Sequence, residues 1–217
     1  MKNLLVQRTF RLPRLWSNQE LRKLAHLFSG KIINVSGWKD EDKEGGFYKD
    51  YFINADSYYL SNYGGKRGES VDQHFEIDLE GDIHCDLIEK FDVVFNHTTL
   101  EHIFDVFKAT SNLCKMTKDI VVIIVPFVQP VHHQSSYLDY WRFTHYSLKK
   151  LLERNGLETI YLSSSPFTNS GIYHLCVGSK KPSYWKDSLS NYSQYINEGK
   201  KVIQEPTLTR IYSQLKK

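Results

Sequence analysis

Blocks of apolar residues alternate with polar segments between residues 91 and 155, and the alternation predicts a repeating order of strands and helices. The apolar run at 93–95 is short and ends in the polar group 96–99. A longer run at 119–127 is almost entirely Val and Ile, which is typical of a parallel strand covered by helices on both faces. A helix is expected after each run, the first at 100–115. This order is typical of the second half of a doubly wound α/β domain.

The rest of the chain supplies the elements that complete such a domain. One polar amphipathic helix and five further strands are expected, at 18–28, 31–36, 50–56, 73–79, 157–164 and 171–180. The loop between the last two strands is too short to hold a helix, so these strands should pair antiparallel. We therefore predict an α/β fold with a doubly wound, seven-stranded, mostly parallel sheet, an antiparallel last strand and the run 119–127 at its centre.

Length and composition suit one folded domain with short additions at each end. The 217 residues include 41% hydrophobic ones, enough to form one core. We divide the chain into an N-terminal helical segment at 1–29, a central domain at 30–181 and a polar C-terminal appendage at 182–217.

Charge, hydropathy and cysteine content exclude several classes of protein. The net charge of +3 and the pI of about 8.6 are too small for a dedicated nucleic-acid binder. No run reaches the roughly 18 apolar residues that span a membrane, and the N-terminus lacks the pattern of a secretory signal, so a cytoplasmic location is expected. The three cysteines are widely separated and the nine histidines show no ligand spacing, so neither a disulfide framework nor a metal site is expected.

Three motifs carry a resemblance to a known family. They are the Leu-Glu-His triplet at 100–102 after the strand Phe-Asp-Val-Val, the Val/Ile run that ends at Pro126, and Asp-Tyr-Trp-Arg-Phe-Thr at 139–144 with two histidines before it. Together they resemble a small branch of the class I methyltransferases, which use S-adenosylmethionine. The order of elements fits that family from about residue 30 to 181. The resemblance implies methyl transfer to a small polar acceptor, and members of this branch are often encoded with enzymes of surface-glycan biosynthesis, which favours a sugar hydroxyl.

The resemblance also implies which residues hold the cofactor. After its first strand the family has an acidic residue followed by glycines, which pass close to the methionine portion of the cofactor. Asn34, Ser36 and Trp38 stand at three of these positions, and Gly37 is the glycine that remains. Asn34, Ser36 and Gly37 are therefore assigned to the cofactor, together with Asn96 at the end of the fourth strand.

Two acidic residues are candidates for the ribose and the adenine. Asp56 ends the expected second strand, about twenty residues beyond the first, the spacing of a ribose-binding acid; the alternative is a residue that only forms a turn. Gly81 to His84 resembles the family's Gly-Asp-Ala-His segment, which places Asp82 beside the adenine and Ile83 against its ring. The alternative for Asp82 is a solvated loop acid.

Candidate catalytic residues follow the fourth and fifth strands. Methyl transfer to a hydroxyl needs alignment and a base, and His97, His132 and His133 are the candidates. The two adjacent histidines have a structural alternative, which is pairing with Asp139 or Tyr140.

The motif at 139–142 is assigned to the acceptor. Arg142 offers a forked guanidinium for a carboxylate or phosphate, Tyr140 and Trp141 offer a stacking wall, and Asp139 completes the set. The alternative for Arg142 is a buried ion pair, with Glu101 or Asp139, that fixes the loop.

Two polar segments lie outside these motifs. The charged segment 38–46 stands where the family commonly starts its first helix, so we expect that helix to be shortened or absent and the segment to be a solvated loop. The alternative is a loop that orders over bound ligand, with Gly45 and Gly46 as a hinge. The C-terminal appendage is expected to be partly helical and to pack on the central domain through Tyr184, Trp185 and Tyr195.

Two functions remain open from the sequence. The first is a methyltransferase with S-adenosylmethionine as cofactor, a small and possibly sugar-linked acceptor, and no nucleic-acid partner. The second is a methyltransferase-fold binding module or partner subunit without independent activity, which the altered glycine loop favours. The sequence leaves open a homo- or hetero-oligomer.

Overall fold

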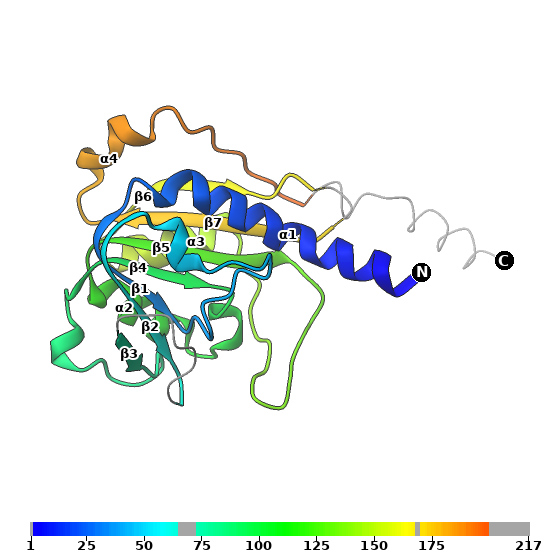
Figure 1. The fold of residues 1–217 in the computed structure, drawn as a ribbon, viewed down its shortest axis with the longest axis horizontal. Coiled ribbons are helices and arrows are strands. Elements are labelled where there is room, and N and C mark those ends of the chain that lie inside the picture. The colour runs from blue at the N-terminus through cyan, green and yellow to red at the C-terminus, as the bar shows by residue number, and fades with distance from the viewer. Residues whose placement is uncertain (1, 65–72, 168–169, 200–217) are drawn as a thin grey trace.

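The computed structural model describes residues 2–64, 73–167 and 170–199. The chain folds around one seven-stranded sheet with the strand order β3-β2-β1-β4-β5-β7-β6 (Figure 1). The strands are β1 Ser29–Val35, β2 Asn54–Asn62, β3 Gln73–Glu76, β4 Phe91–His97, β5 Thr117–Val128, β6 Glu158–Ser164 and β7 Ile172–Ser179. The α-helices are α1 Lys2–Ala25, α2 Val106–Met116, α3 His145–Arg154 and α4 Pro182–Leu189, and the 3₁₀ helices are η1 Tyr48–Tyr51, η2 Cys85–Leu87 and η3 Leu100–His102.

The pairing of the strands confirms the predicted fold class. Each pair among β1 to β5 is parallel, and β7 pairs antiparallel with both β5 and β6. The centre of the sheet is β4 rather than β5, so that detail of the prediction was wrong. Both strands are buried along most of their length, and apolar character therefore could not separate the central strand from its neighbour.

The second strand lies later in the chain than predicted. Aromatic residues before it form η1, and Tyr48 and Tyr51 turn into the core from this 3₁₀ helix. The expected strand at 50–56 begins inside this 3₁₀ helix, whereas β2 itself starts at Asn54 and runs on to Asn62. As a result Asp56 is exposed near the amino end of β2, and its predicted position at the carboxyl end of the strand was wrong.

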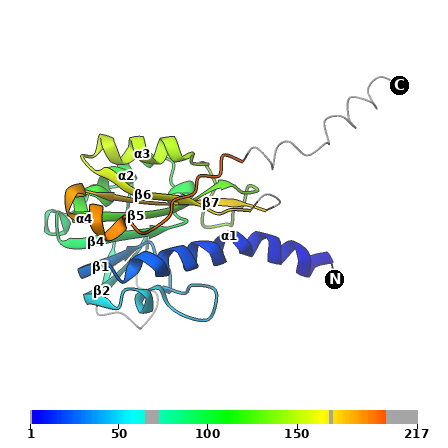
Figure 2. The same ribbon diagram turned by 90° about the horizontal axis from the view of Figure 1, so that it is seen from above.

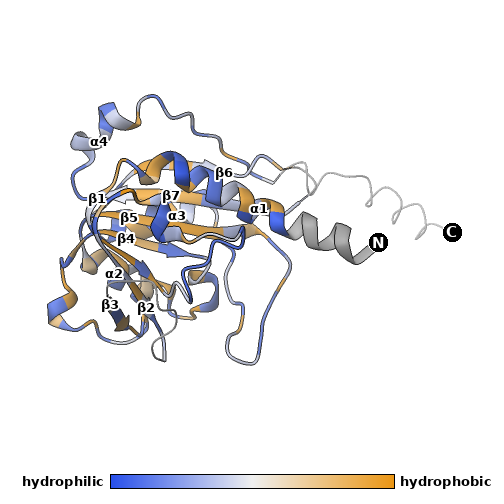
Figure 3. Cartoon of the chain, in the orientation of Figure 1, coloured by the Kyte–Doolittle hydropathy of each residue, from blue (hydrophilic) through white to orange (hydrophobic). Residues whose placement is uncertain are grey.

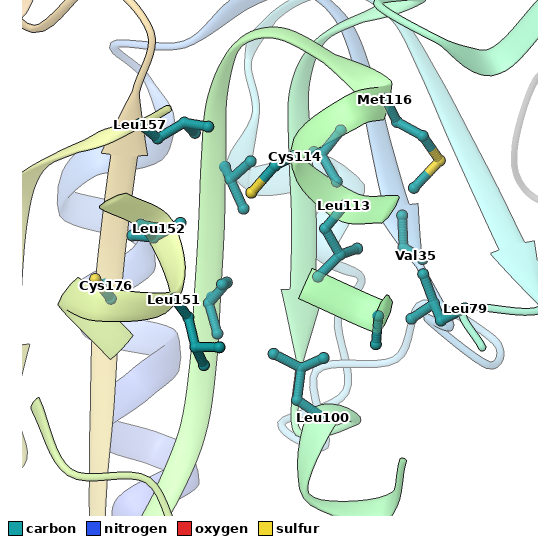
Figure 4. Close-up of a cluster of buried hydrophobic side chains, with 14 of the residues drawn as sticks. Val35, Leu79, Leu100, Leu113, Cys114, Met116, Leu151, Leu152, Leu157 and Cys176 are labelled. Atoms are coloured by element: carbon teal, nitrogen blue, oxygen red, sulfur yellow. The ribbon is translucent and has the colours of Figure 1, made fainter. Parts of the chain in front are cut away.

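Helices cover both faces of the sheet and create two cores. α2 and α3 pack on one face through residues such as Leu113 and Leu152 (Figure 4). α1, η1 and α4 cover the other face, opposite α2 and α3 (Figure 2). Each fully buried leucine contributes about 2 kcal/mol by leaving water. The strands are mostly hydrophobic, whereas α1 also carries hydrophilic residues on its outer side (Figure 3).

The N-terminal helix is longer than predicted and belongs to this second core. The expected helix at 18–28 is the last part of α1, which begins at Lys2 and contains Pro13. Leu21, Leu24 and Ala25 of α1 are fully buried. α1 packs on β7 as well as on η1, so it covers the sheet where other helices of this face are short.

The crossover from β1 to β2 has no α-helix, which confirms that expectation. Its charged segment is not simply solvated, because Asp42 is buried and accepts hydrogen bonds from the backbone N–H groups of Glu44 and Gly46. Asn18 of α1 donates to the Asp42 carbonyl at 2.8 Å, and Arg22 lies 3.2 Å from the Asp42 carboxylate. The segment is therefore held against α1.

The C-terminal appendage is helical at its start. α4 buries Trp185, whose indole N–H donates to Asp119 at 2.9 Å, so its predicted packing role is confirmed. Tyr184 is 75% exposed, and that part of the prediction was wrong; the Tyr195 ring is half exposed while its backbone carbonyl accepts from Ser164 N–H. Residues of the appendage beyond 199 lie outside the described part. Among the helices described, none combines the length and apolar character that a membrane span requires.

Candidate functional site

A cleft of about 370 Å³ opens at the carboxyl ends of β1 and β4. Chain order reverses between these neighbouring strands, and in open α/β sheets ligands bind at such a switch point. The lining residues come from α1, the β1–β2 crossover, the end of β4 and the loop after β5: Arg14, Asn34, Ser36, Gly37, Trp38, Glu41, Lys43, Tyr48, His97, Thr98, Thr99, His102, His132 and Tyr137. A second hollow, of about 460 Å³, lies between β6 and α4, away from these strand ends.

The β1 side of the cleft is built around a buried aspartate. The Asp40 carboxylate accepts from the Asn34 amide at 2.7 Å, the Tyr58 hydroxyl at 2.8 Å and the Lys49 N–H at 2.8 Å. Burial raises the pKa of Asp40, and these hydrogen bonds oppose the shift. Gly37 lies against this network, since a Cβ there would stand 2.5 Å from both Asn34 and Leu60. The glycine kept in the altered loop is therefore required by packing.

Trp38 takes a position that the family gives to glycine. Its φ of +55° lies in the left-handed region, and Asn62 at the end of β2 holds it there. The Asn62 side chain accepts from Trp38 N–H at 2.8 Å and donates to Trp38 C=O at 3.0 Å. The indole is 52% exposed and lines the cleft. Ser36 also lies in the left-handed region and lines the cleft.

His97 forms the floor of the cleft and has both ring nitrogens engaged. Arg14 lies 3.0 Å from Nδ1, and because a guanidinium only donates, Nδ1 accepts. The ring proton is therefore on Nε2, which lies 3.0 Å from the Ser17 hydroxyl. Burial and the Arg14 charge hold the pKa of His97 well below its usual value. His97 is thus a neutral, fixed histidine, which argues against its predicted role as a base.

Glu101 is the feature of the site that sequence reasoning missed as a functional group. Its side chain is fully buried in η3, directly after β4. Neither carboxyl oxygen has a hydrogen-bond partner in the described part of the chain. Burial raises the pKa of Glu101 to about 8. Buried polar groups are almost always satisfied, so this unsatisfied carboxyl group, next to the cleft residue His102, points to a ligand.

His102 and His132 face each other next to Glu101. Their ring centroids are 4.9 Å apart. His102 Nδ1 lies 2.6 Å from the Leu138 carbonyl, which only accepts, so Nδ1 carries the proton and Nε2 is free of it. That Nε2 lies 3.7 Å from Glu101 Oε1. Burial lowers the pKa of His102.

His132 is oriented by the loop in the same way. Its Nδ1 lies 3.3 Å from both the Pro130 carbonyl and the Asp139 carboxylate, and its backbone N–H donates to Asp139 at 2.8 Å. Among the described residues, no hydrogen bond engages Nε2. The structure thus bears out the predicted contact with Asp139 and still places His132 in the cleft wall.

The forked guanidinium of Arg142 is used inside the protein. It makes two 2.6 Å bonds to Asp139 and donates to the carbonyls of Gln129 and Pro130 at 3.0 Å each. Burial alone would raise the pKa of Asp139, but the bonds from Arg142 and His132 lower it to about 2. The structure therefore supports the alternative in which Arg142 fixes the loop, and neither Arg142 nor Asp139 lines the cleft.

The other residues assigned to the acceptor lie beside the cleft rather than in it. The Trp141 indole donates to the carbonyls of Ile103 and Phe104, and the Tyr140 ring packs edge-on against Phe104. His133 is exposed and does not line the cleft. Tyr140, Trp141 and the catalytic candidate His133 are therefore not part of the cleft wall that contains His102 and His132.

Of the residues assigned to the adenine and to the end of β4, Asp82 is exposed, whereas Ile83 packs on a core and Asn96 is buried. Asp82 is exposed and pairs with Lys108 at 2.6 Å, which lowers the pKa of Asp82. Ile83 packs on the first core. Asn96 is fully buried, donates to the Val35 carbonyl at 2.9 Å, and leaves its Oδ1 without a partner in the described chain.

Comparison with known proteins reveals the fold but no close relative. No protein-family model and no curated protein matches the chain. A 1,6-didemethyltoxoflavin-N1-methyltransferase from Burkholderia thailandensis, with bound 1,6-didemethyltoxoflavin and S-adenosylhomocysteine, has a TM-score of 0.56 at 13% identity and covers 76% of this chain and 80% of its own. A magnesium protoporphyrin IX methyltransferase from Synechocystis with bound S-adenosylmethionine has a TM-score of 0.56 at 12% identity, with 80% and 83% covered.

A third solved structure gives the same result. An S-adenosylmethionine-dependent methyltransferase from Mesorhizobium loti has a TM-score of 0.52 at 11% identity, and the alignment covers 69% of this chain and 90% of that one. The similarity extends over most of each protein, although their sequences have diverged widely. The chain therefore has the fold of the class I methyltransferases that use S-adenosylmethionine.

Proposed function

We propose that the protein is an S-adenosylmethionine-dependent methyltransferase that acts on a hydroxyl of a small polar acceptor, such as a sugar or a surface-glycan precursor. The observation that carries the proposal is the cleft at the switch point between β1 and β4, with two oriented imidazoles in its wall. The fold supports it, because the solved structures similar to this chain are methyltransferases.

The residues at the ends of β1 and β4 fit the amino acid end of the cofactor. The buried Oδ1 atoms of Asn34 and Asn96 have no donor within the described residues, and an ammonium group supplies donors to such acceptors. Trp38 adds an aromatic face to the cleft, which suits a positive charge. When bound, the cofactor supplies a methyl group already activated on a sulfonium. The task of the chain is then to align the acceptor and remove its proton.

His102 and His132 are the groups best placed to act on that proton. Each has its Nδ1 turned to a protein oxygen, so Nε2 is the nitrogen available to the cleft. Tyr137 and the polar side chains of Glu41 and Lys43 complete a wall of hydrogen-bonding groups. Such a wall suits an acceptor with several hydroxyls, which supports the sugar as the acceptor class.

A second candidate function is a binding module or partner subunit with this fold and no activity of its own. It is favoured by the end of β2, where the family has a carboxylate for the ribose. Asn62 stands there, and its side-chain amide is hydrogen-bonded to the Trp38 backbone. Asp56 is exposed near the other end of the strand. The ribose would then depend on other groups.

Calorimetry with S-adenosylmethionine and S-adenosylhomocysteine separates the two functions. Thr99→Trp would fill the cleft from its partly exposed wall, and Asp56→Trp is the matched control, since Asp56 is exposed near the amino end of β2. The proposal expects saturable binding by the wild type and by Asp56→Trp, and none by Thr99→Trp. Absence of binding by folded wild-type protein would reject the first function and favour the second.

A further inference from the structure

Three metal-ligating side chains meet at the ends of β4 and β5. Glu101 and His102 follow β4 in η3, and His132 follows β5. One ligand atom from each lies within 4.8 Å of the other two. The adjacent residues 101 and 102 contribute together because they lie in a 3₁₀ turn. Sequence spacing gave no sign of this group, because the carboxyl ends of two parallel strands bring it together.

The state of Glu101 is the first argument that a cation belongs here. A carboxyl group without hydrogen bonds in a fully buried position is costly, because its desolvation is not repaid. Buried charges in proteins are paired or coordinate metals. The described chain offers Glu101 no direct partner, and its nearest recorded basic group is His102 Nε2 at 3.7 Å.

The orientation of both histidines is the second and independent argument. A histidine that binds a metal through one nitrogen almost always donates the other N–H to a carbonyl or a carboxylate. His102 Nδ1 is held by the Leu138 carbonyl, and His132 Nδ1 lies beside the Pro130 carbonyl and the Asp139 carboxylate. Arg142 fixes Asp139 in turn. In each ring, Nε2 is therefore the nitrogen left to bind an ion.

We propose that Glu101, His102 and His132 bind a divalent first-row transition-metal ion of the zinc class. Two imidazoles and one carboxylate are a common ligand set for such an ion, and they leave a position open for a further ligand. Tetrahedral ligands of Zn²⁺ lie about 3.3 Å apart, and the three ligand atoms lie within 4.8 Å of one another, so the group needs to contract by about 1.5 Å at most.

The surrounding charges indicate what the open position binds. The carboxylates of Glu101 and Asp139 are balanced by the guanidinium groups of Arg14 and Arg142, which act on Glu101 electrostatically. A divalent ion would then leave a positive charge that an anionic oxygen can neutralise. The open position therefore suits an alkoxide or a hydroxide, and since His102 and His132 line the cleft, the ion would face the acceptor.

The role of the ion rests on the proposed function and deepens it. With Nε2 of His102 and His132 bound to the ion, these histidines act on the acceptor proton through the ion rather than directly. The acceptor hydroxyl binds the ion through oxygen and loses its proton to solvent, because a bound divalent ion makes such a group far more acidic. The alkoxide oxygen then forms a bond to the methyl carbon as the carbon–sulfur bond breaks and its electron pair stays on sulfur. His132 thus assists proton removal through the ion.

Metal binding can be measured without any methyltransferase assay. The full chain, stripped with a chelator, is titrated with Zn²⁺ by calorimetry and with Co²⁺ by visible absorption. The variants are Glu101→Gln and His132→Gln, and the matched control is His133→Gln, which changes the exposed neighbour. A second control, His84→Gln, covers the exposed group of His84, Cys85 and Asp86.

The proposal expects one Zn²⁺ per chain, a tetrahedral Co²⁺ spectrum, and a loss of affinity of about tenfold or more in Glu101→Gln and His132→Gln. Both controls should bind as the wild type does. It is overturned if folded wild-type protein binds no Zn²⁺, or if only His84→Gln loses binding. Metal binding without cofactor binding would reject the proposed function alone, and cofactor binding without metal binding would reject the metal site alone.

Discussion

The buried acids Asp40 and Asp42, on the β1 side of the cleft, differ in their hydrogen bonding from Glu101, on the side formed by β4 and β5. On the β1 side, Asp40 and Asp42 are buried and every oxygen of both carboxylates accepts hydrogen bonds from the protein. On the side formed by β4 and β5, Glu101 is equally buried and neither oxygen has a partner among the described residues.

The difference separates structural chemistry from ligand chemistry. A satisfied buried acid holds a loop in place, and its removal leaves donors unpaired. An unsatisfied buried acid weakens the fold unless a ligand binds it. Stability measurements on variants of the two sides can therefore test the comparison without knowledge of the acceptor.

The largest effect is expected on the β1 side. Asp40→Ala should lower the free energy of unfolding by about 4 kcal/mol, because it removes the carboxylate that accepts from the Tyr58 hydroxyl and the Asn34 amide and places Ala at a left-handed φ. Urea unfolding at neutral pH measures it. Asp40→Asn is the control and should lose much less, since Asn tolerates this φ and keeps one acceptor. Equal losses would show that one acceptor and a tolerated φ are not enough and that the full carboxylate is required.

The next effect lies in the loop that orients His132. Arg142→Ala should cost about 3 kcal/mol, because it leaves the buried Asp139 carboxylate without its charge partner. Calorimetric unfolding measures the loss. Lys150→Ala removes an exposed pair with Glu153 and should cost less than about 1 kcal/mol. A stable Arg142→Ala protein that had lost only acceptor use would restore the predicted binding role of Arg142.

His97, at the end of β4, gives a pH-dependent test of another buried group whose polar atoms are satisfied. In the folded protein its pKa is well below the usual value, so only the unfolded chain takes up a proton as the pH falls below about 6.5. Stability should be constant above that pH and then decline by up to about 1.4 kcal/mol per pH unit on acidification. His97→Gln should show a shallower decline in urea unfolding from pH 7 to pH 5. Parallel curves for the two proteins would mean that His97 titrates normally.

The smallest effect is expected at Glu101, and it has the opposite sign. In metal-free protein, Glu101→Gln should raise the free energy of unfolding by about 1 kcal/mol, because a buried ionisable group is replaced by a neutral one of the same shape. Thermal unfolding in the presence of a chelator measures it. With Zn²⁺ added the order should reverse, since only the wild type gains stability from binding. A destabilised variant in chelator would mean that Glu101 has a partner within the fold.

The fold was largely readable from the sequence, and the error at the second strand has a local cause. Buried strands such as β4 and β5 have an apolar run that few other elements share. Near β2, however, the expected strand at 50–56 begins in a 3₁₀ helix, where Tyr51 is followed by the apolar Phe52 and Ile53. Such a short apolar run does not separate the two conformations, and this moved Asp56 to the wrong end of the sheet.

The candidate site was only partly readable. Positions after β4 and β5 were expected from topology, and His132 lies in the cleft as predicted. Arg142 and Asp139 turned to each other because both lie in one loop at a spacing of three residues. Arg14 was missed because α1 begins far from β4 in sequence, and only packing brings it to His97.

The sequence by itself determined the order of strands and helices, the antiparallel last strand, and the edge of the sheet where polar residues collect. Hydrophobic periodicity and chain connectivity decide these features locally. Only the tertiary structure decided which polar groups are satisfied, because that depends on donors and acceptors distant in the chain. It paired Asp40 with Asn34 and Tyr58, and it left Glu101 beside His102 and His132, with neither carboxyl oxygen hydrogen-bonded among the described residues.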